Sequence, residues 1–207
     1  MFEYYPFDLI PLRYPYDALE PYISAASLRE HHTKHLGGCV NTLNSILGKY
    51  PQYQKWPLEK LIKSSRVLLP ELHAQVKNSA SCVFNHNFLF NVMGPECVPP
   101  EGQLLAAIDK HFGSLETFLY KWKDSALKVH GSGYTWLAAN ATSQLMIVNT
   151  TDCILNLNLN PVLAIDMWEH AYFLQYQTDK EDYVENWVHT INWTSAEAYY
   201  KYYLSHS

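Results

Sequence analysis

The sequence lacks any run of basic residues and any long apolar stretch. It has 207 residues with 15 Lys and Arg against 20 Asp and Glu, which gives a formal net charge of −5. Without a cluster of cations the chain has nothing to neutralise a phosphate backbone, so we expect no nucleic-acid partner. No segment approaches the roughly 20 apolar residues that span a bilayer, so we expect no membrane partner either.

Cysteine is also scarce. The chain has Cys39, Cys82, Cys97 and Cys153, too few for a disulfide scaffold at this length. Its first residues, MFEYYPFDLIPLRYPYD, are acidic and interrupted by proline. They have neither the basic start nor the apolar centre of a secretory signal. We therefore expect a cytoplasmic protein.

What the sequence does have is a high content of apolar and aromatic residues, with 48% hydrophobic residues and 16 Tyr. That composition is typical of a folded globular chain. Prolines punctuate the start as far as Pro21, which predicts an extended, irregular segment. Ser24 then has the character of an N-cap for a long helix. In that helix His31 and His35 fall four residues apart, on one face. A second long helix is expected from about Leu72 to Met93.

A linker at 94–100 separates this helical N-terminal half from a C-terminal half in which helices and strands are both expected. Helical segments are expected over 101–131, with a break at Gly113-Ser114. Three short apolar stretches then have the pattern of strands: GYTWLAAN, QLMIVNT and VLAIDMW. The segment 180–205 returns to a helical pattern. The fold class predicted is α+β, with an N-terminal helical-hairpin domain (1–96) and a C-terminal domain (97–207) containing a small antiparallel sheet surrounded by helices.

Four side chains in mostly apolar segments are candidate metal ligands: His31, His86, Asp166 and His170. Asp166 and His170 are expected at the end of a strand and in the turn after it. Three imidazoles and one carboxylate suit Fe, Mn or Zn and lack the thiolates of a structural zinc site. Taken singly, each has an ordinary interpretation as a surface histidine, a core histidine or a turn aspartate. Spacing alone does not bring their three segments together.

Six blocks of sequence, in order, resemble the iron/manganese superoxide dismutase family from about Tyr14 to Trp193. They are YPYDALEPYIS, HHTKHL, FNHNFLFN, GSGYTWL, DMWEHAYFLQY and YVENWVHTINW. The resemblance implies one Fe or Mn ion per subunit, bound by the four candidate ligands, with superoxide as substrate. It also implies a homodimer through the region of Glu169 and His170, in which Glu169 hydrogen-bonds the partner's ligand histidine. Tyr134, Phe84 and Trp168 would wall the pocket, and His32 is expected on the helix surface.

The chain departs from the family around the expected metal. The family's buried Gln, which hydrogen-bonds the metal-bound solvent, comes from one of two positions, and Cys82 and Cys153 occupy them here. Cys39 replaces the gateway Tyr, and Phe173 replaces the Tyr that reaches across the dimer to His35. In the family, a Gln at either position places its amide at nearly the same point. Cys82 and Cys153 are therefore predicted to lie close together as a disulfide or thiol pair. Small buried cysteines that only fill space are the alternative.

Two functions therefore stay open. The first is an active dismutase, an oxidoreductase that converts superoxide to oxygen and hydrogen peroxide. The second is a metal-binding homologue with lost or altered activity, serving as a structural subunit or a thiol redox sensor. Besides the four ligands, the residues expected to influence the chemistry are His35, Cys39, Cys82, Cys153, Tyr134 and Glu169.

Overall fold

The computed structural model describes residues 4–96, 98–153 and 159–205. Among these residues no helix is both long enough and apolar enough to cross a membrane. The principal helices are α1 (Ala25–Glu30), α2 (Gly37–Leu47), α3 (Leu58–Lys63), α4 (His73–Asn91), α5 (Gly102–Phe112), α6 (Leu115–Leu127), α7 (Glu169–Tyr176), α8 (Lys180–Trp187) and α9 (Trp193–Leu204). The strands are β1 (Gly133–Ala139), β2 (Leu145–Thr151) and β3 (Asn160–Asp166).

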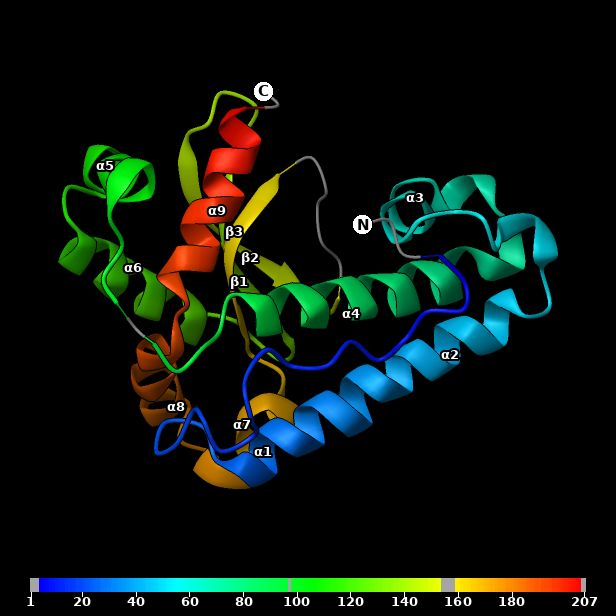
Figure 1. Ribbon diagram of the computed structural model, residues 1–207, viewed down its shortest axis with the longest axis horizontal. Helices are drawn as coiled ribbons and strands as arrows, with labels where there is room; N and C mark the ends of the chain where they lie inside the picture. Colours follow the sequence, from blue (N-terminus) through cyan, green and yellow to red (C-terminus); the bar gives the residue numbers. More distant parts are fainter. Residues whose placement is uncertain (1–3, 97, 154–158, 206–207) are drawn as a thin grey trace.

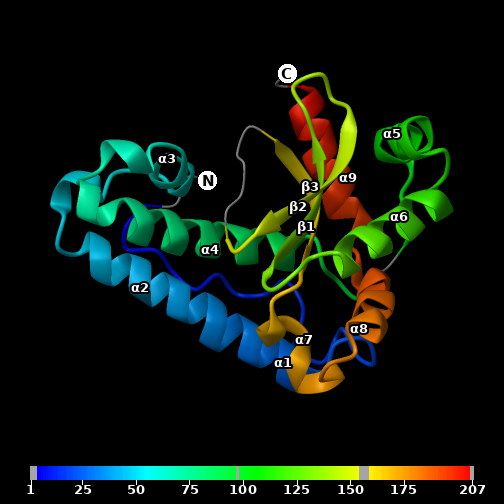
Figure 2. The same ribbon diagram turned by 180° about the vertical axis from the view of Figure 1, so that it is seen from behind.

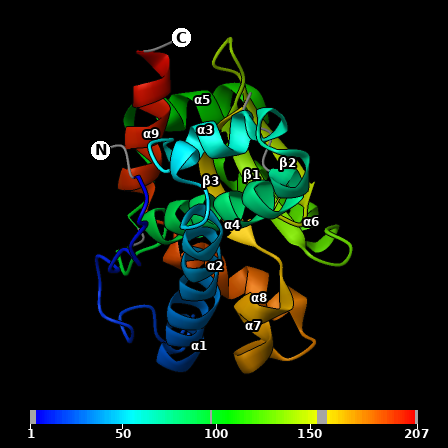
Figure 3. The same cartoon turned by 90° about the vertical axis from the view of Figure 1, so that its right-hand side faces the viewer.

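The N-terminal half is a hairpin of two long helical rods. One rod runs through α1, a π-helical segment (His31–Leu36) and α2, and α4 returns beside it in the opposite direction (Figures 1 and 3). Ser24 starts the first rod, since its hydroxyl accepts the Ser27 N–H at 3.2 Å. The predicted N-cap and both predicted long helices are thus confirmed, with α4 beginning one residue later and ending two residues earlier than expected.

The π-helical segment was not predicted from the sequence. In it the Gly37 N–H reaches back to the carbonyl of His32, five residues earlier, so the turn holds an extra residue. Short π-helical segments of this kind occur often at functional sites. This one contains His31 and His35, and therefore sets the direction in which both imidazoles project.

The C-terminal half is built on a three-stranded antiparallel sheet in the order β2–β1–β3. β1 is the central strand, and all seven of its residues are buried. Helix α6 packs against β1 and β2, while α4 and α9 pack against β3 (Figure 2). The predicted α+β class, with a helical hairpin followed by a small sheet among helices, is confirmed.

Turn chemistry explains where the predicted helices end. The break between α5 and α6 is confirmed: Gly113 has φ +96°, and the Ser114 hydroxyl then accepts the Thr117 N–H at 3.0 Å. The helix expected over 180–205 is instead two helices, α8 and α9, separated by a tight turn (Val188–Thr190). A backbone bridge between Met93 and Ile191 follows that turn and joins the two halves of the chain.

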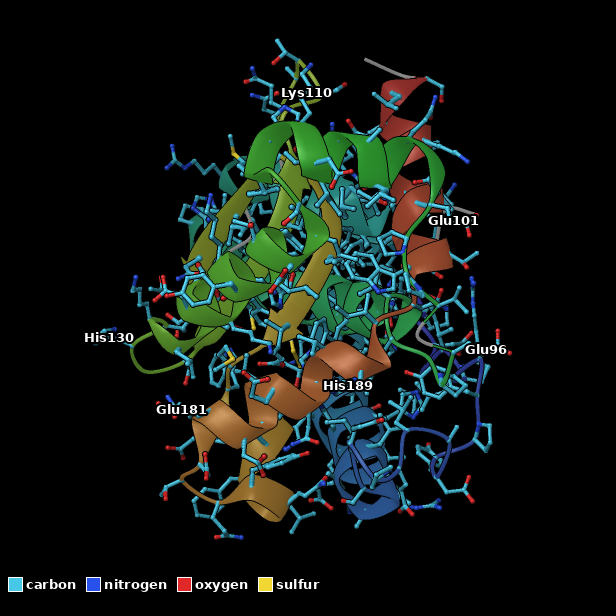
Figure 4. All side chains as sticks on the ribbon, turned by 90° about the vertical axis from the view of Figure 1, so that its left-hand side faces the viewer. Glu96, Glu101, Lys110, His130, Glu181 and His189 are labelled. Atoms are coloured by element: carbon cyan, nitrogen blue, oxygen red, sulfur yellow. A yellow bond between two sulfur atoms is a disulfide. The ribbon has the colours of Figure 1, made fainter. Side chains whose placement is uncertain are left out.

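One hydrophobic core extends through both halves. Trp122 and Trp187 stack at 6.0 Å in the C-terminal half, and the same cluster continues to Leu43 in the hairpin. At the surface, the Tyr22 ring stacks on His189 at 4.7 Å and ties the N-terminal segment to the turn after α8. Figure 4 labels His189 on this face of the molecule. This continuity holds the hairpin and the sheet in one fixed arrangement, which a site assembled from both halves requires.

Candidate metal centre

Four polar side chains from four separate elements converge between the hairpin and the sheet. His31 comes from the π-helical segment, His86 from α4, Asp166 from the last position of β3, and His170 from the first turn of α7. Each side chain offers one nitrogen or oxygen atom as a ligand, and these four atoms all lie within 4.8 Å of one another. His170 was expected in a turn after the strand, and this was wrong: a helix begins at Glu169.

The separations around Asp166 are those of atoms that share one cation. Asp166 Oδ2 lies 3.3 Å from His31 Nε2, 3.3 Å from His170 Nε2 and 3.8 Å from His86 Nε2. Two donors each about 2.1 Å from a common ion, at right angles or wider, lie about 3.0–4.2 Å apart. All four atoms are buried, and none has a hydrogen-bond partner among the residues that the structure describes. Buried polar atoms without partners are costly, so a shared cation is the physical explanation that fits them.

Two hydrogen bonds orient these donors. His86 Nδ1 lies 2.8 Å from the carbonyl oxygen of Cys82, so it carries the proton it donates and leaves Nε2 free as a ligand. Asp166 Oδ1 accepts the Trp168 N–H at 2.8 Å, which leaves Oδ2 facing the imidazoles. The Asp166 carbonyl accepts the Tyr183 hydroxyl at 2.9 Å and fixes the end of β3.

For three of the four donors, the environment favours the protonation state that binds metal. Burial lowers the pKa of His31, and burial with the neighbouring His31 lowers the pKa of His86 to about 3. Burial by itself would raise the pKa of Asp166, but the His170 and His31 imidazoles beside it bring that pKa well below its ordinary value. Neutral imidazoles and an ionised carboxylate are the forms that ligate a cation.

Aromatic rings enclose the cluster. Trp168 stacks on His170 at 5.5 Å, and the Tyr134 ring lies 6.4 Å from His86. Phe90, which the sequence did not single out, meets His31 edge-on at 5.1 Å. Phe84 was expected in this wall, and that was wrong: it stacks on Phe88 and lines a separate surface groove. The rings exclude water from one side of the donors.

Two family models match nearly the whole chain. The alpha-hairpin domain of iron/manganese superoxide dismutases matches residues 6–94, and the C-terminal domain of the same family matches 100–199. The chain belongs to the iron/manganese superoxide dismutase family. The predicted resemblance is confirmed, and with it the enzyme class, an oxidoreductase of the superoxide dismutase type.

Curated relatives agree with this family over nearly their full length. A protein named superoxide dismutase [Mn] from Thermus aquaticus is 36% identical over 200 residues, which are 95% of this chain and 98% of that protein. Superoxide dismutase [Mn] 2 from Bacillus anthracis is 36% identical over 190 residues, 90% of this chain and 91% of that protein. Superoxide dismutase [Mn] from Pseudomonas putida is 34% identical over 198 residues, covering 94% and 97%.

The sulfur chemistry beside the cluster differs from the prediction. Cys82 is bonded to Cys39, with Cα atoms 6.1 Å apart, and Cys153 is a free thiol. The predicted pair of Cys82 with Cys153 is therefore wrong. Cys39 lies on α2 and Cys82 on α4, and these two packed helices bring the sulfurs together. Cys97 lies outside the described residues.

The free thiol of Cys153 is held in its protonated form. Burial raises its pKa to about 12, with a further contribution from the negative charge of Asp166. Tyr134 is fully buried, and burial together with Asp166 raises the pKa of its hydroxyl as well. Its oxygen has no hydrogen-bond partner among the described residues. Both groups therefore remain proton-bearing at neutral pH.

His35, in the π-helical segment, and Glu169, the residue before His170 on α7, both lie beside His170. The His35 ring stacks on His170 at 4.0 Å, and burial with the nearby imidazoles of His170 and His31 lowers its pKa to about 4. Glu169 is exposed at the start of α7, as is Phe173 one turn later. An acidic and an apolar side chain thus emerge on the surface close to a candidate ligand.

His32 is a second residue whose place the sequence did not indicate. It was expected on the helix surface, but its side chain is buried, with Nδ1 2.8 Å from the Tyr16 hydroxyl and Nε2 2.8 Å from the Ile10 carbonyl. These bonds attach the irregular N-terminal segment to the rod that carries His31. The signal in the sequence was the proline-rich N-terminal segment, because an extended segment needs side chains from elsewhere to satisfy its backbone hydrogen-bonding groups.

The metal-free chain is expected to lose stability as the pH falls from 7 to 5. The folded pKa of His86 is about 3, below its ordinary value of 6.5, so the unfolded chain binds more protons throughout that window. For His86 alone the loss is about 2 kcal/mol in the free energy of unfolding, which urea titrations at the two pH values would measure. Exposed His130 is the matched control, and His130→Gln should leave the loss unchanged. A pH-independent free energy would contradict the prediction.

Proposed function

We propose that this family member binds one Fe or Mn ion per subunit through His31, His86, Asp166 and His170 and disproportionates superoxide to oxygen and hydrogen peroxide. The observation that carries the ligand assignment is the convergence of four buried donor atoms, none of which has a hydrogen-bond partner in the described part of the chain. A redox-active ion held there supplies the alternating one-electron oxidation and reduction that the reaction needs. The relatives named above carry manganese in their names, which supports Mn as the first metal to test.

The chain's own groups have distinct tasks in this proposal. The Asp166 carboxylate contributes the single negative charge among the ligands, and the Cys82 carbonyl fixes the ring of His86 through Nδ1. Trp168 and Phe90 keep bulk water away. Cys153, at one of the family's two Gln positions, and Tyr134 are proton-bearing groups whose pKa values Asp166 helps to raise, and the His35 ring stacks on His170.

Metal analysis paired with an activity assay tests this function. The purified chain would be stripped of metal, reconstituted separately with Mn²⁺ and Fe²⁺, and measured for bound metal and for superoxide consumption. We expect about one ion per chain, and superoxide loss that depends on metal loading. A matched control is His111→Gln, because His111 lies on α5, outside the four elements that carry the donors, and its Nδ1 bonds the Ala107 carbonyl of its own helix.

A second function, a metal-binding homologue without rapid turnover, is favoured by one observation. Neither position that holds the family's Gln has an amide here, and one of the two, Cys82, is bonded to Cys39. A thiol or disulfide is a weak hydrogen-bond partner, so the metal's potential would lack its usual adjustment. A full complement of metal with negligible superoxide consumption, for both metals, would establish this second function over the first.

We also propose a homodimer through the exposed start of α7, with Glu169 at its centre. Glu169, Phe173 and Leu174 are all exposed on this short helix, and the two apolar side chains are 46% and 56% accessible. Light scattering on the wild type and on Glu169→Ala measures the assembly, which we expect to weaken in the variant.

The division of the chain into domains 1–96 and 97–207 remains a proposal as well, supported by family models that match 6–94 and 100–199.

A further inference from the structure

The disulfide lies between the two helices that carry candidate metal ligands. Cys82 is one turn before His86 on α4: its carbonyl holds His86 Nδ1 at 2.8 Å, and its sulfur is 3.5 Å from the same nitrogen. Cys39 is one turn after His35, whose ring stacks on His170 at 4.0 Å. A two-electron sulfur couple therefore lies against the candidate metal centre, although the dismutation of superoxide makes no use of one.

The two sulfurs differ in access. Cys82 is buried at 9% exposure, whereas Cys39 on α2 is only half-buried. An external thiol reaches an exposed sulfur more readily than a buried one. The arrangement places one sulfur toward the cluster and the other where a reductant from solution can attack.

From this placement we propose that Cys39 and Cys82 form a dithiol couple that reduces hydrogen peroxide, a second activity beside dismutation. Starting from the two thiols, one thiolate attacks a peroxide oxygen, the O–O bond breaks, and the other oxygen leaves as water. The attacking sulfur becomes a sulfenic acid. The second thiol attacks that sulfur, the S–O bond breaks, the disulfide forms, and a second water leaves. Two thiols and one peroxide thus give one disulfide and two waters.

A dithiol completes the cycle. Attack of its thiolate on Cys39 gives a mixed disulfide and frees Cys82, and its second thiol then releases Cys39 as a thiol. The reductant leaves as its own disulfide, so the two electrons that peroxide accepted come from the dithiol. The oxidant is the peroxide that the proposed dismutation releases close to the pair. The sulfur step itself needs no metal, and it therefore goes beyond the proposed function.

Thiol counting on the metal-loaded full chain tests the couple directly. The protein would be reduced with dithiothreitol, freed of reductant, and treated with one equivalent of hydrogen peroxide. We expect two thiols to disappear for each peroxide consumed, and a peptide containing Cys39 linked to one containing Cys82 in the mass spectrum. Retention of all thiols, or a linkage that involves other cysteines, would overturn the proposal.

Turnover is tested with dithiothreitol and peroxide both in excess, using matched variants. Cys39→Ser/Cys82→Ser retains all four candidate ligands, so any peroxide loss caused by the metal persists in it. We expect its dithiol-dependent peroxide consumption to be at least tenfold below the wild type. Cys97→Ser removes a thiol with no assigned role, retains the pair and should consume peroxide at the wild-type rate. If Cys97→Ser instead loses the activity, or the double variant keeps it, the assignment to Cys39 and Cys82 fails.

Two further measurements keep the result independent of folding and of dismutation. Circular dichroism of each variant checks that it is folded, and the linked-peptide analysis on the wild type needs no variant. Peroxide is added from outside, so a chain that consumes no superoxide can still pass the thiol test. The converse outcome, dismutation without thiol loss, would reject the dithiol couple alone.

Discussion

Replacement of Asp166 by Asn should leave a folded chain that is almost free of metal. The amide oxygen can still accept the Trp168 N–H that Asp166 Oδ1 accepts now, so the turn after β3 is retained. What is lost is the only negative charge among the four donors. Changing a hydrogen-bond partner of a ligand already costs about 10–100-fold in metal affinity or activity, so losing the charged ligand should cost about 100-fold or more.

Metal content per chain and superoxide consumption would be measured together for Asp166→Asn. We expect bound metal below about a tenth of the wild-type content under identical loading, consistent with the loss in affinity expected for a missing ligand. The matched control is Asp109→Asn on α5, whose side chain is exposed. It removes the same charge from the chain and should bind metal normally. Wild-type metal content in Asp166→Asn would remove that residue from the ligand set.

Loading the site with its metal should produce the largest change in thermal stability. The four donor atoms are buried without hydrogen-bond partners in residues 4–96, 98–153 and 159–205, so the metal-free fold bears a cost that a bound ion removes. With free metal at about 1,000 times the dissociation constant, the folded state gains about 4 kcal/mol. In a chain of this size each kcal/mol raises Tm by about 2–4 °C, so we expect a rise of roughly 8–16 °C.

Scanning calorimetry of metal-free and reconstituted protein would measure this shift. Asp166→Asn serves as its control, because a chain unable to hold the ion should show nearly the same Tm with and without metal. A wild-type Tm that does not respond to Mn²⁺ or Fe²⁺ would mean that the four donors do not bind either ion. A Tm shift of equal size in Asp166→Asn would place the ion elsewhere.

The local elements were predictable because each depends on nearby residues. Ser24 and Ser114 cap helices through hydrogen bonds that reach only three residues along the chain. The strands of the sheet were likewise recognisable as short apolar runs. The π-helical segment and the helix that begins at Glu169 escaped prediction. Neither has a local propensity signal strong enough to separate it from an ordinary α-helix or a turn, and packing of the ligand-bearing elements decides them.

The sulfur pairing shows the limit of reasoning by position in a family. Cys82 and Cys153 were predicted to pair because the family's Gln residues at these two positions bring their amides to nearly the same point. A Cys side chain is shorter than Gln and does not reach that point. Gln extends two atoms further than Cys, and the short thiol of Cys82 instead meets Cys39 on the adjacent helix. Which neighbour a short side chain contacts depends on how closely the helices pack. The distance between two helices cannot be predicted from a sequence pattern.

By itself the sequence determined the α+β class, the Ser24 cap, the family and the four candidate ligands, because periodicity, capping and ordered motifs depend on residues close together along the chain. The tertiary structure alone decided that those donors meet within 4.8 Å, that Phe90 and His32 support them, and that Cys39 bonds Cys82. The reason is that a contact between residues tens of positions apart is set by how helices and strands pack. That packing is a property of the whole core.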